Sequence, residues 1–163
     1  MIFVTVGTHE QQFNRLIKYM DILSKEINCE VVIQTGYSTY VPRYCTHKPL
    51  YTYDEMSQYM NEAQIIVTHG GPSSFMSAVE IGKVPLVVPR RKEYGEHVNN
   101  HQVEFCKEIE KRYGYIKVVD VSDLKDTILN FDRLMLSQIA PSYNNKNFCD
   151  EFVRIVDTLM GVA

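Results

Sequence analysis

The sequence predicts an α/β fold: a single Rossmann-like parallel sheet with helices on both faces. Three observations support this prediction. Short apolar runs rich in β-branched residues alternate with longer segments whose apolar residues recur at helical spacing, which is the pattern of strands and helices in a parallel sheet. Three of these runs end directly before Gly7, Gly36 and His69, which would lie together at the carboxyl edge of a parallel sheet, where ligands bind. Finally, 163 residues suit one domain with a full core, and no internal boundary or repeat is visible.

In the first half of the chain, strands and helices follow one another closely. The runs that stop at Gly7 and Gly36 are apolar, and the segment between them carries apolar residues every three or four positions. Asp54 is a candidate N-cap, and Pro72 suits the first position of a helix, where no N–H group is needed. The expected strands are 2–6, 29–35, 50–53 and 65–68, the expected helices are 13–27, 54–61 and 73–81, and 36–49 is an expected loop.

The same alternation continues in the second half. Two prolines frame a short apolar run, and Ser122 is a candidate N-cap. The last expected helix carries an apolar stripe, which packs either on its own domain or on a partner subunit. Both interpretations stay open here. The expected strands are 86–88 and 116–119, and the expected helices are 97–113, 122–135 and about 147–160.

The composition argues against several classes of protein. A net charge of −3 disfavours a nucleic-acid-binding protein, whose surface would be basic. No apolar run approaches the roughly 20 residues that span a bilayer, and the start MIFVTVGTHE is expected to be a first strand rather than a signal peptide. The cysteines are scattered without zinc-ligand spacing, so reduced thiols and no metal site are expected. They are Cys29, Cys45, Cys106 and Cys149.

The strongest candidate site is the glycine-rich turn after the 65–68 strand. Glycines let a ligand approach the backbone, and N–H groups and hydroxyls at the start of the next helix would hold a diphosphate. The histidine that opens the turn is expected to point toward that phosphate. The alternative is that the glycines only form a tight turn and the serines only cap the helix. The turn consists of His69, Gly70, Gly71, Pro72, Ser73 and Ser74.

A second candidate segment, Gly7-Thr8-His9-Glu10, follows the first strand. It is not GxGxxG, which disfavours an NAD-dependent dehydrogenase. His9 or Glu10 could serve as a general base, because both residue types can be tuned toward neutral pH. The alternative is a simple helix start that is capped by Thr8.

A third candidate segment is the polar loop that follows the 86–88 strand. Arg90 or Arg91 could neutralise a phosphate, and Asn100 and Gln102 offer both donors and acceptors to sugar hydroxyls. The alternative is a solvated surface of mixed charge. No DxD sequence occurs, so a metal-bound diphosphate is not expected, and the helix dipole, hydroxyls and arginine would stabilise the leaving group.

The joint pattern of THGGPSS followed by GKVPLVVPRRKEYGEHVNNHQ resembles the C-terminal, donor-binding half of the family 28 GT-B glycosyltransferases. The resemblance covers nearly the whole chain. It is greatest to the small catalytic subunit of two-chain enzymes: bacterial capsular or exopolysaccharide β-1,4-galactosyltransferases, and the eukaryotic dolichol-pathway UDP-GlcNAc transferase. It implies half of a GT-B fold over residues 1–163.

The resemblance also implies roles for individual residues. His69, Gly70, Gly71, Ser73 and Ser74 match the diphosphate-binding turn, Gly7 and Thr8 match a loop that faces the interdomain cleft, and Asn100, His101 and Gln102 match residues near the donor sugar. One position departs from the family pattern. Ser77 stands where many relatives have an acid that holds the ribose, and Glu80, about one helical turn further, could substitute only if the helix is shifted.

The function that this resemblance implies is an inverting transfer of a hexose, with galactose favoured, from a UDP-sugar to a lipid-diphosphate-linked saccharide in capsule or exopolysaccharide synthesis. It implies no cofactor and no metal. It further implies a membrane-anchored subunit that binds the acceptor, and therefore a cytoplasmic chain held at the inner face of the membrane. The alternative is a non-catalytic nucleotide-sugar-binding module. A hexosamine-2-epimerase-like enzyme is disfavoured, because it would ordinarily need two domains in one chain.

Overall fold

The computed structural model describes residues 1–136 and 153–154. In this part of the chain, six parallel strands form one sheet in the order β3-β2-β1-β4-β5-β6, which confirms the predicted fold class. The strands are β1 (Ile2–Thr5), β2 (Val31–Gln34), β3 (Thr46–Lys48), β4 (Ile65–His69), β5 (Leu86–Val88) and β6 (Lys117–Val118). The predicted helix at about 147–160 lies outside the described residues, apart from 153–154.

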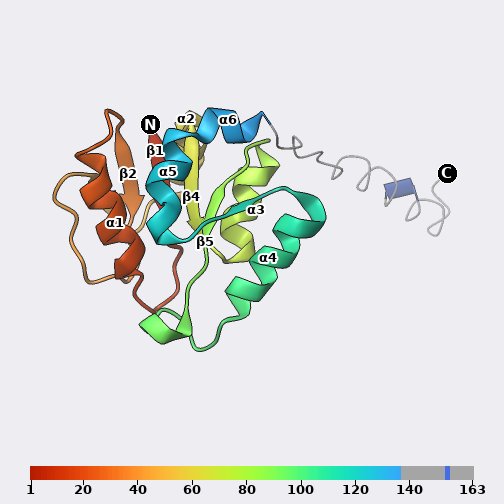
Figure 1. The fold of residues 1–163 in the computed structure, drawn as a ribbon, viewed down its shortest axis with the longest axis horizontal. Coiled ribbons are helices and arrows are strands. Elements are labelled where there is room, and N and C mark those ends of the chain that lie inside the picture. The colour runs from red at the N-terminus through yellow and green to blue at the C-terminus, as the bar shows by residue number, and fades with distance from the viewer. Residues whose placement is uncertain (137–152, 155–163) are drawn as a thin grey trace.

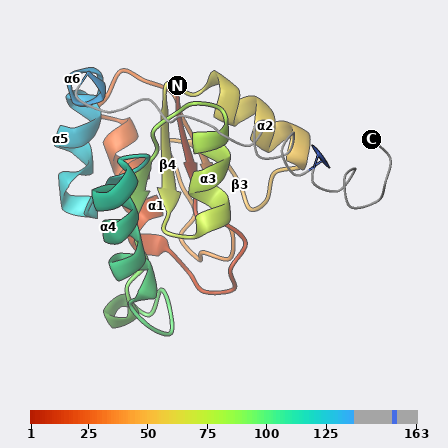
Figure 2. The same ribbon diagram turned by 90° about the vertical axis from the view of Figure 1, so that its right-hand side faces the viewer.

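Helices cover both faces of the sheet, as Figures 1 and 2 show. Figure 2 separates α1, α5 and α6 on one side from α2 and α3 on the other. The helices are α1 (Asn14–Ser24), α2 (Tyr53–Glu62), α3 (Pro72–Glu80), α4 (His101–Tyr113), α5 (Leu124–Leu129) and α6 (Phe131–Met135), and two short 3-10 turns are η1 (Lys92–Tyr94) and η2 (Val121–Asp123).

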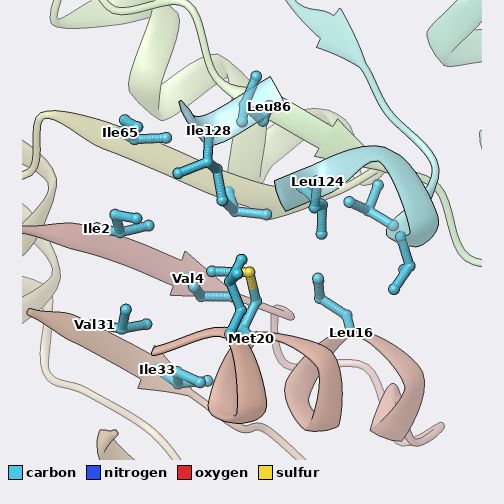
Figure 3. Packing of buried hydrophobic residues seen from close by; sticks show 14 of the residues in the cluster. Ile2, Val4, Leu16, Met20, Val31, Ile33, Ile65, Leu86, Leu124 and Ile128 are labelled. Carbon is cyan, nitrogen blue, oxygen red and sulfur yellow. The ribbon is translucent and has the colours of Figure 1, made fainter. Parts of the chain in front are cut away.

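The continuous apolar runs of the sequence supply both faces, because successive strand residues point to opposite sides. In β1, for example, Ile2 and Val4 pack with Leu16 and Met20 of α1 (Figure 3). The intervening Phe3 packs on the other face, with residues of α2 and α3. Burial on both faces makes these short strands the centre of the domain.

The order of the strands reverses between β1 and β4. From β1 the chain builds outward through β2 and β3, and it then returns to form β4 on the other side of β1. The carboxyl ends of β1 and β4 are therefore adjacent, with Thr5 in register with Thr68. Ligands of such sheets bind where the strand order reverses, and this place is called the switch point of the sheet. Figure 1 shows the loop after β1 and the loop after β5 running together at this edge.

Some predicted elements are wrong in position. The strand expected at 50–53 does not form; the edge strand is Thr46–Lys48, which is polar and exposed and so lacks the apolar signature of a buried strand. The N-cap of α2 is Thr52, which forms a capping box with Glu55; Asp54 is not the cap.

In the second half, two expected helices also differ. Helix α4 begins at His101 rather than at residue 97, because the side chains of His97 and Asn99 each accept a hydrogen bond from the backbone N–H two residues further on and hold this segment in turns. The helix expected at 122–135 is divided into η2, α5 and α6, and Asp120, not Ser122, caps it by accepting a hydrogen bond from the Ser122 amide.

Candidate functional site

Two cavities adjoin the switch point, one on each side of the turn that follows β4. The first, the α2-side cavity, has a volume of about 780 Å³ and is lined by Gly7, Thr8, His9, Glu10, His69, Ser73, Ser74 and Ser77, together with Leu50 and Tyr51. The second, the α4-side cavity, has a volume of about 720 Å³ and is lined by Gly70, Pro72, His97, His101, Gln102, Glu104, Phe105 and Glu108. The first and second candidate segments of the sequence thus meet at one site.

His69 is the structural centre of the turn. Its ring is so tightly enclosed by two glycines that a Cβ atom at Gly7 would lie 2.4 Å from Nε2, and one at Gly71 would lie 2.2 Å from Cε1. Nδ1 accepts the Gly71 N–H at 3.0 Å, so the proton of the neutral ring is on Nε2, which donates to Ser74 Oγ at 2.9 Å. Burial, helped by the positive charge of Arg90, lowers the pKa of His69 to about 3. His69 is therefore a neutral brace for the turn, with both ring nitrogens already bonded.

The start of α3 retains part of its anion-binding capacity. Gly70 N–H donates to Gln102 Oε1 and Gly71 N–H donates to His69, so these two amides are already used. The amide of Ser73 has no bond among the described residues, and Ser73 and Ser74 line the α2-side cavity. The Ser74 hydroxyl accepts from His69 and keeps its own proton to donate. These groups lie at the positive end of a helix, where a phosphate is favoured.

Gln102 joins the turn to the loop after β5. Its Oε1 accepts the Gly70 N–H at 3.1 Å and the Arg90 N–H at 3.0 Å. Its side chain also lines the α4-side cavity, and its Nε2 forms no bond within the described part of the chain. The predicted role at the donor sugar is therefore open to Gln102 through that amide group.

The structure does not place Arg90 at the ligand. Its side chain is 1% exposed and sits against the ring of Phe13. Nη1 donates to the carbonyl oxygens of Gln11, Gln12 and Glu96, and Nη2 donates to that of Val6. Burial lowers the pKa of Arg90 to about 10, so the group remains a cation at neutral pH. The expected phosphate contact is corrected: Arg90 ties the loop after β1 to the loop after β5.

Other residues of the polar loop are also engaged with the chain. Arg91 pairs with Asp120 at 2.6 Å. Arg91 lines neither cavity. Asn100 accepts the Lys92 N–H and donates to Glu93, which holds η1 in place. Sequence patterns cannot show such pairing, because the partners of Arg91 and Asn100 are fixed by the folded loop. These two predicted contacts with the donor are not supported by the geometry.

His101 lines one of the two cavities, and Glu80 lines neither. His101 is exposed and lines the α4-side cavity, and its place near a sugar stays a prediction. Glu80 is exposed at the end of α3 and lines neither cavity. Ser77 does line the α2-side cavity, with its hydroxyl donating to the Ser73 carbonyl at 2.9 Å. No carboxylate of α3 therefore reaches the position expected for a ribose-binding acid.

The loop after β1 presents Thr8, His9 and Glu10 to the α2-side cavity. Thr8 does not cap a helix, since α1 begins only at Asn14. His9 Nδ1 accepts the Gln11 N–H at 3.2 Å. Glu10 is exposed and forms no bond to another described residue. Of the two predicted candidates for a base, Glu10 thus has the free acceptor atoms.

His97 is a site residue that the sequence did not single out. Its ring lies beside that of His9, with centroids 5.5 Å apart, and it lines the α4-side cavity. The only signal was its place in a polar loop after a strand. Its pairing with His9 depends on two loops that are far apart in sequence.

The described residues hold neither a metal-binding cluster nor a membrane-spanning helix. No group of three or more His, Cys, Asp or Glu side chains among them is placed to hold a metal ion. No helix in residues 1–136 is long and apolar enough to cross a membrane. Cys106 is buried, and Cys29 and Cys45 are half-buried free thiols.

Comparison with known proteins gives a consistent picture. Residues 1–158 match the glycosyltransferase family 28 C-terminal domain. The chain is 32% identical over 120 residues to the mouse UDP-N-acetylglucosamine transferase subunit ALG13, and 32% identical over 121 residues to the human protein. These matches cover 67% and 68% of the chain but only 10% of each relative, so the chain spans about a tenth of their length.

Solved structures share the fold. A glycotransferase of kitacinnamycin superposes with a TM-score of 0.56 at 14% identity, over 79% of this chain and 34% of that one. Acinetobacter baumannii MurG superposes with a TM-score of 0.51 at 19% identity, over 81% of this chain and 40% of that one. These likenesses confirm the predicted Rossmann-like fold of the GT-B glycosyltransferases.

Proposed function

The chain belongs to the glycosyltransferase family 28 C-terminal domain family, and from this we propose that it binds a UDP-sugar at the switch point and carries the donor half of a glycosyltransferase active site. The observation that carries the proposal is the junction of the α3 start with the loop after β1. Ser73 and Ser74 offer an amide and hydroxyls at a positive helix end, and Glu10 offers a free carboxylate in the same cavity.

In the proposed arrangement the diphosphate lies at the start of α3, and the two cavities receive the ends of the substrate. The α2-side cavity, with Tyr51 and Ser77 in its wall, takes the nucleoside. The α4-side cavity takes the sugar, whose hydroxyls suit the amide of Gln102, His101 and the carboxylate of Glu104. Without a carboxylate at position 77, the ribose hydroxyls are held by hydroxyl groups.

The proposed reaction is an inverting displacement. An acceptor hydroxyl forms a bond to the anomeric carbon of the donor sugar as the bond from that carbon to the diphosphate oxygen breaks. The bonding electron pair leaves with UDP, and the proton of the acceptor passes to the carboxylate of Glu10, which follows His9; the His9 ring lies beside His97 of the α4-side cavity. Helix α3 and the serines stabilise the negative charge that develops on the leaving diphosphate. No metal is assigned a role in this scheme.

The donor sugar and the partner belong to the same proposal. The names of the mouse and human relatives favour N-acetylglucosamine; galactose is what the resemblance to bacterial exopolysaccharide transferases implied, and no comparison supports it. The relatives are named as subunits, which favours a second chain that supplies the acceptor site. We place this partner at the cytoplasmic face of a membrane, with a lipid-linked saccharide as acceptor.

The test is a thermal-shift panel of UDP-N-acetylglucosamine, UDP-galactose, UDP-glucose and UDP, followed by assays of UDP release with and without membranes that hold the partner. A bound ligand raises the unfolding temperature by mass action. Stabilisation by one UDP-sugar and release of UDP only with the partner is the expected result. No stabilisation by any uridine nucleotide would contradict the proposal. Binding without turnover under every condition would favour the non-catalytic module.

A further inference from the structure

We propose that His97 contacts the substrate directly: together with His9 it forms a clamp of two imidazoles that donates hydrogen bonds to the diphosphate. This inference rests on the proposed function, because it names the part of the sugar nucleotide that the two rings hold. We call this pair the histidine clamp.

The position of the clamp supports this role. His9 lines the α2-side cavity and His97 lines the α4-side cavity, yet the ring centroids are only 5.5 Å apart. The pair therefore lies at the boundary of the two cavities. A substrate whose ends occupy both cavities has its diphosphate at that boundary, opposite the start of α3.

The orientation of both rings is fixed by the backbone. His9 Nδ1 accepts the N–H of Gln11, and His97 Nδ1 accepts the N–H of Asn99 at 3.3 Å. In the neutral form each ring therefore carries its proton on Nε2, away from the backbone contact. Nε2 of neither ring has a hydrogen-bond partner within residues 1–136, so each ring can donate its N–H group to a ligand.

The two loops that carry the rings are held together rigidly. Arg90 donates to the carbonyls of Gln11 and Gln12 in one loop and to that of Glu96, next to His97, in the other. The Glu96 carboxylate is 0% exposed and accepts two bonds of 2.9 Å from Arg15. Donors that are fixed before the ligand arrives stabilise negative charge well, because no reorganisation is needed.

The surrounding charges place the phosphate at the clamp. Arg90 is buried and Arg91 is paired with Asp120, so neither guanidinium serves the ligand. Glu104 and Glu108 line the α4-side cavity and Glu10 lines the α2-side cavity; carboxylates suit sugar hydroxyls but repel a phosphate, so they disfavour the diphosphate inside either cavity. The boundary between the cavities, with two imidazole donors, is the favourable place for the diphosphate.

Calorimetric titration of the whole chain with UDP, uridine and inorganic pyrophosphate tests the clamp. A hydrogen bond to a charged group contributes roughly 1.5–3 kcal/mol, so His97→Ala is expected to weaken UDP binding by about 10- to 100-fold. Uridine binding should not change, since uridine has no diphosphate. His97→Gln keeps a neutral donor and should recover part of the affinity. His47→Ala, an exposed histidine on β3 that lines neither cavity, is the matched control.

The outcomes separate the clamp from the proposed function. Equal UDP affinity in wild type and His97→Ala would overturn the clamp and leave the nucleotide site standing. Wild type that binds uridine as tightly as UDP would overturn the clamp as well. If wild type bound neither UDP nor a UDP-sugar, the proposed function would fail, and pyrophosphate would decide: binding that depends on His97 supports an anion clamp, and no binding overturns it. Unfolding midpoints of all variants show that each one folds.

Discussion

Arg90 Nη2 donates a hydrogen bond of 2.8 Å to the carbonyl oxygen of Val6, although the two residues are 84 positions apart in the sequence. A side chain from the loop after β5 thereby fixes the end of β1. Three further bonds from Nη1 hold the same two loops. The geometry of the site thus depends on one buried guanidinium that lines neither the α2-side nor the α4-side cavity.

Replacement of Arg90 by lysine is expected to lower the free energy of unfolding by about 3 kcal/mol, because a buried cation would lose most of its acceptors. Denaturant titration measures the change. The matched control is Arg112→Lys, which alters an exposed pair with Glu108 and should cost less than about 0.5 kcal/mol. Similar losses in the two variants would show that the Arg90 contacts contribute little.

Gly7 and Gly82 provide a matched test of the enclosure of His69. Both have positive φ, +73° and +77°, but a Cβ at Gly7 would meet the His69 ring and one at Gly82 would meet nothing within 4 Å. Gly82→Ala is expected to cost about 1 kcal/mol for the backbone alone. Gly7→Ala should cost about 1–3 kcal/mol more, from the clash, and should weaken UDP-sugar binding. Equal unfolding free energies would show that His69 moves aside freely.

The stability of the protein should depend on pH through His69. Its pKa of about 3 in the folded state lies below the ordinary value of 6.5, so the unfolded chain binds a proton first as the pH falls. The contribution of His69 is therefore complete above pH 6.5 and declines toward pH 3, by at most about 1.4 kcal/mol per pH unit. Denaturant titrations at pH 7.5, 6.5 and 5.5 measure it. His69→Gln should show a smaller decline than wild type, and identical pH profiles would refute the assignment.

Glu10 and His9 should differ in kinetics. Glu10→Gln removes the proposed base and is expected to lower kcat by about 10²- to 10⁴-fold with little change in the KM for donor. His9→Ala removes a hydrogen-bond donor and should raise that KM, with a smaller effect on kcat. Steady-state UDP release in the presence of the partner measures both. An unchanged kcat in Glu10→Gln would show that Glu10 is not the base, and a residue of the partner chain would then be the candidate.

Metal removal tests the proposed stabilisation of the leaving group. If α3, the serines and the histidine clamp serve the diphosphate, then excess EDTA should leave UDP-sugar affinity and UDP release unchanged within about twofold. The assay compares EDTA-treated enzyme with and without added magnesium. A large loss that magnesium restores would show that the reaction needs a metal ion.

Much of the fold could be predicted because its signals are local. Apolar runs and helical spacing located the buried strands β1, β2, β4 and β5, and the glycines marked the turn after β4. The edge strand β3 was misplaced, because Thr46–Lys48 is exposed and carries no apolar pattern. The start of α4 was misplaced by four residues, since the side-chain bonds of His97 and Asn99 that hold the preceding turns leave no pattern in the sequence.

The sequence by itself determined the α/β class and the presence of a glycine-rich turn beside a polar loop, because strand burial and helix starts depend on neighbouring residues. Only the tertiary structure decided what those polar residues do. Arg90 became a buried tie, His69 a neutral brace and His97 a partner of His9, although no residue type distinguishes these roles. The roles of Arg90 and His97 follow from contacts between loops that lie tens of residues apart. His69 bonds within its own turn, but its enclosure by Gly7 and the nearby charge of Arg90 also come from distant parts of the chain.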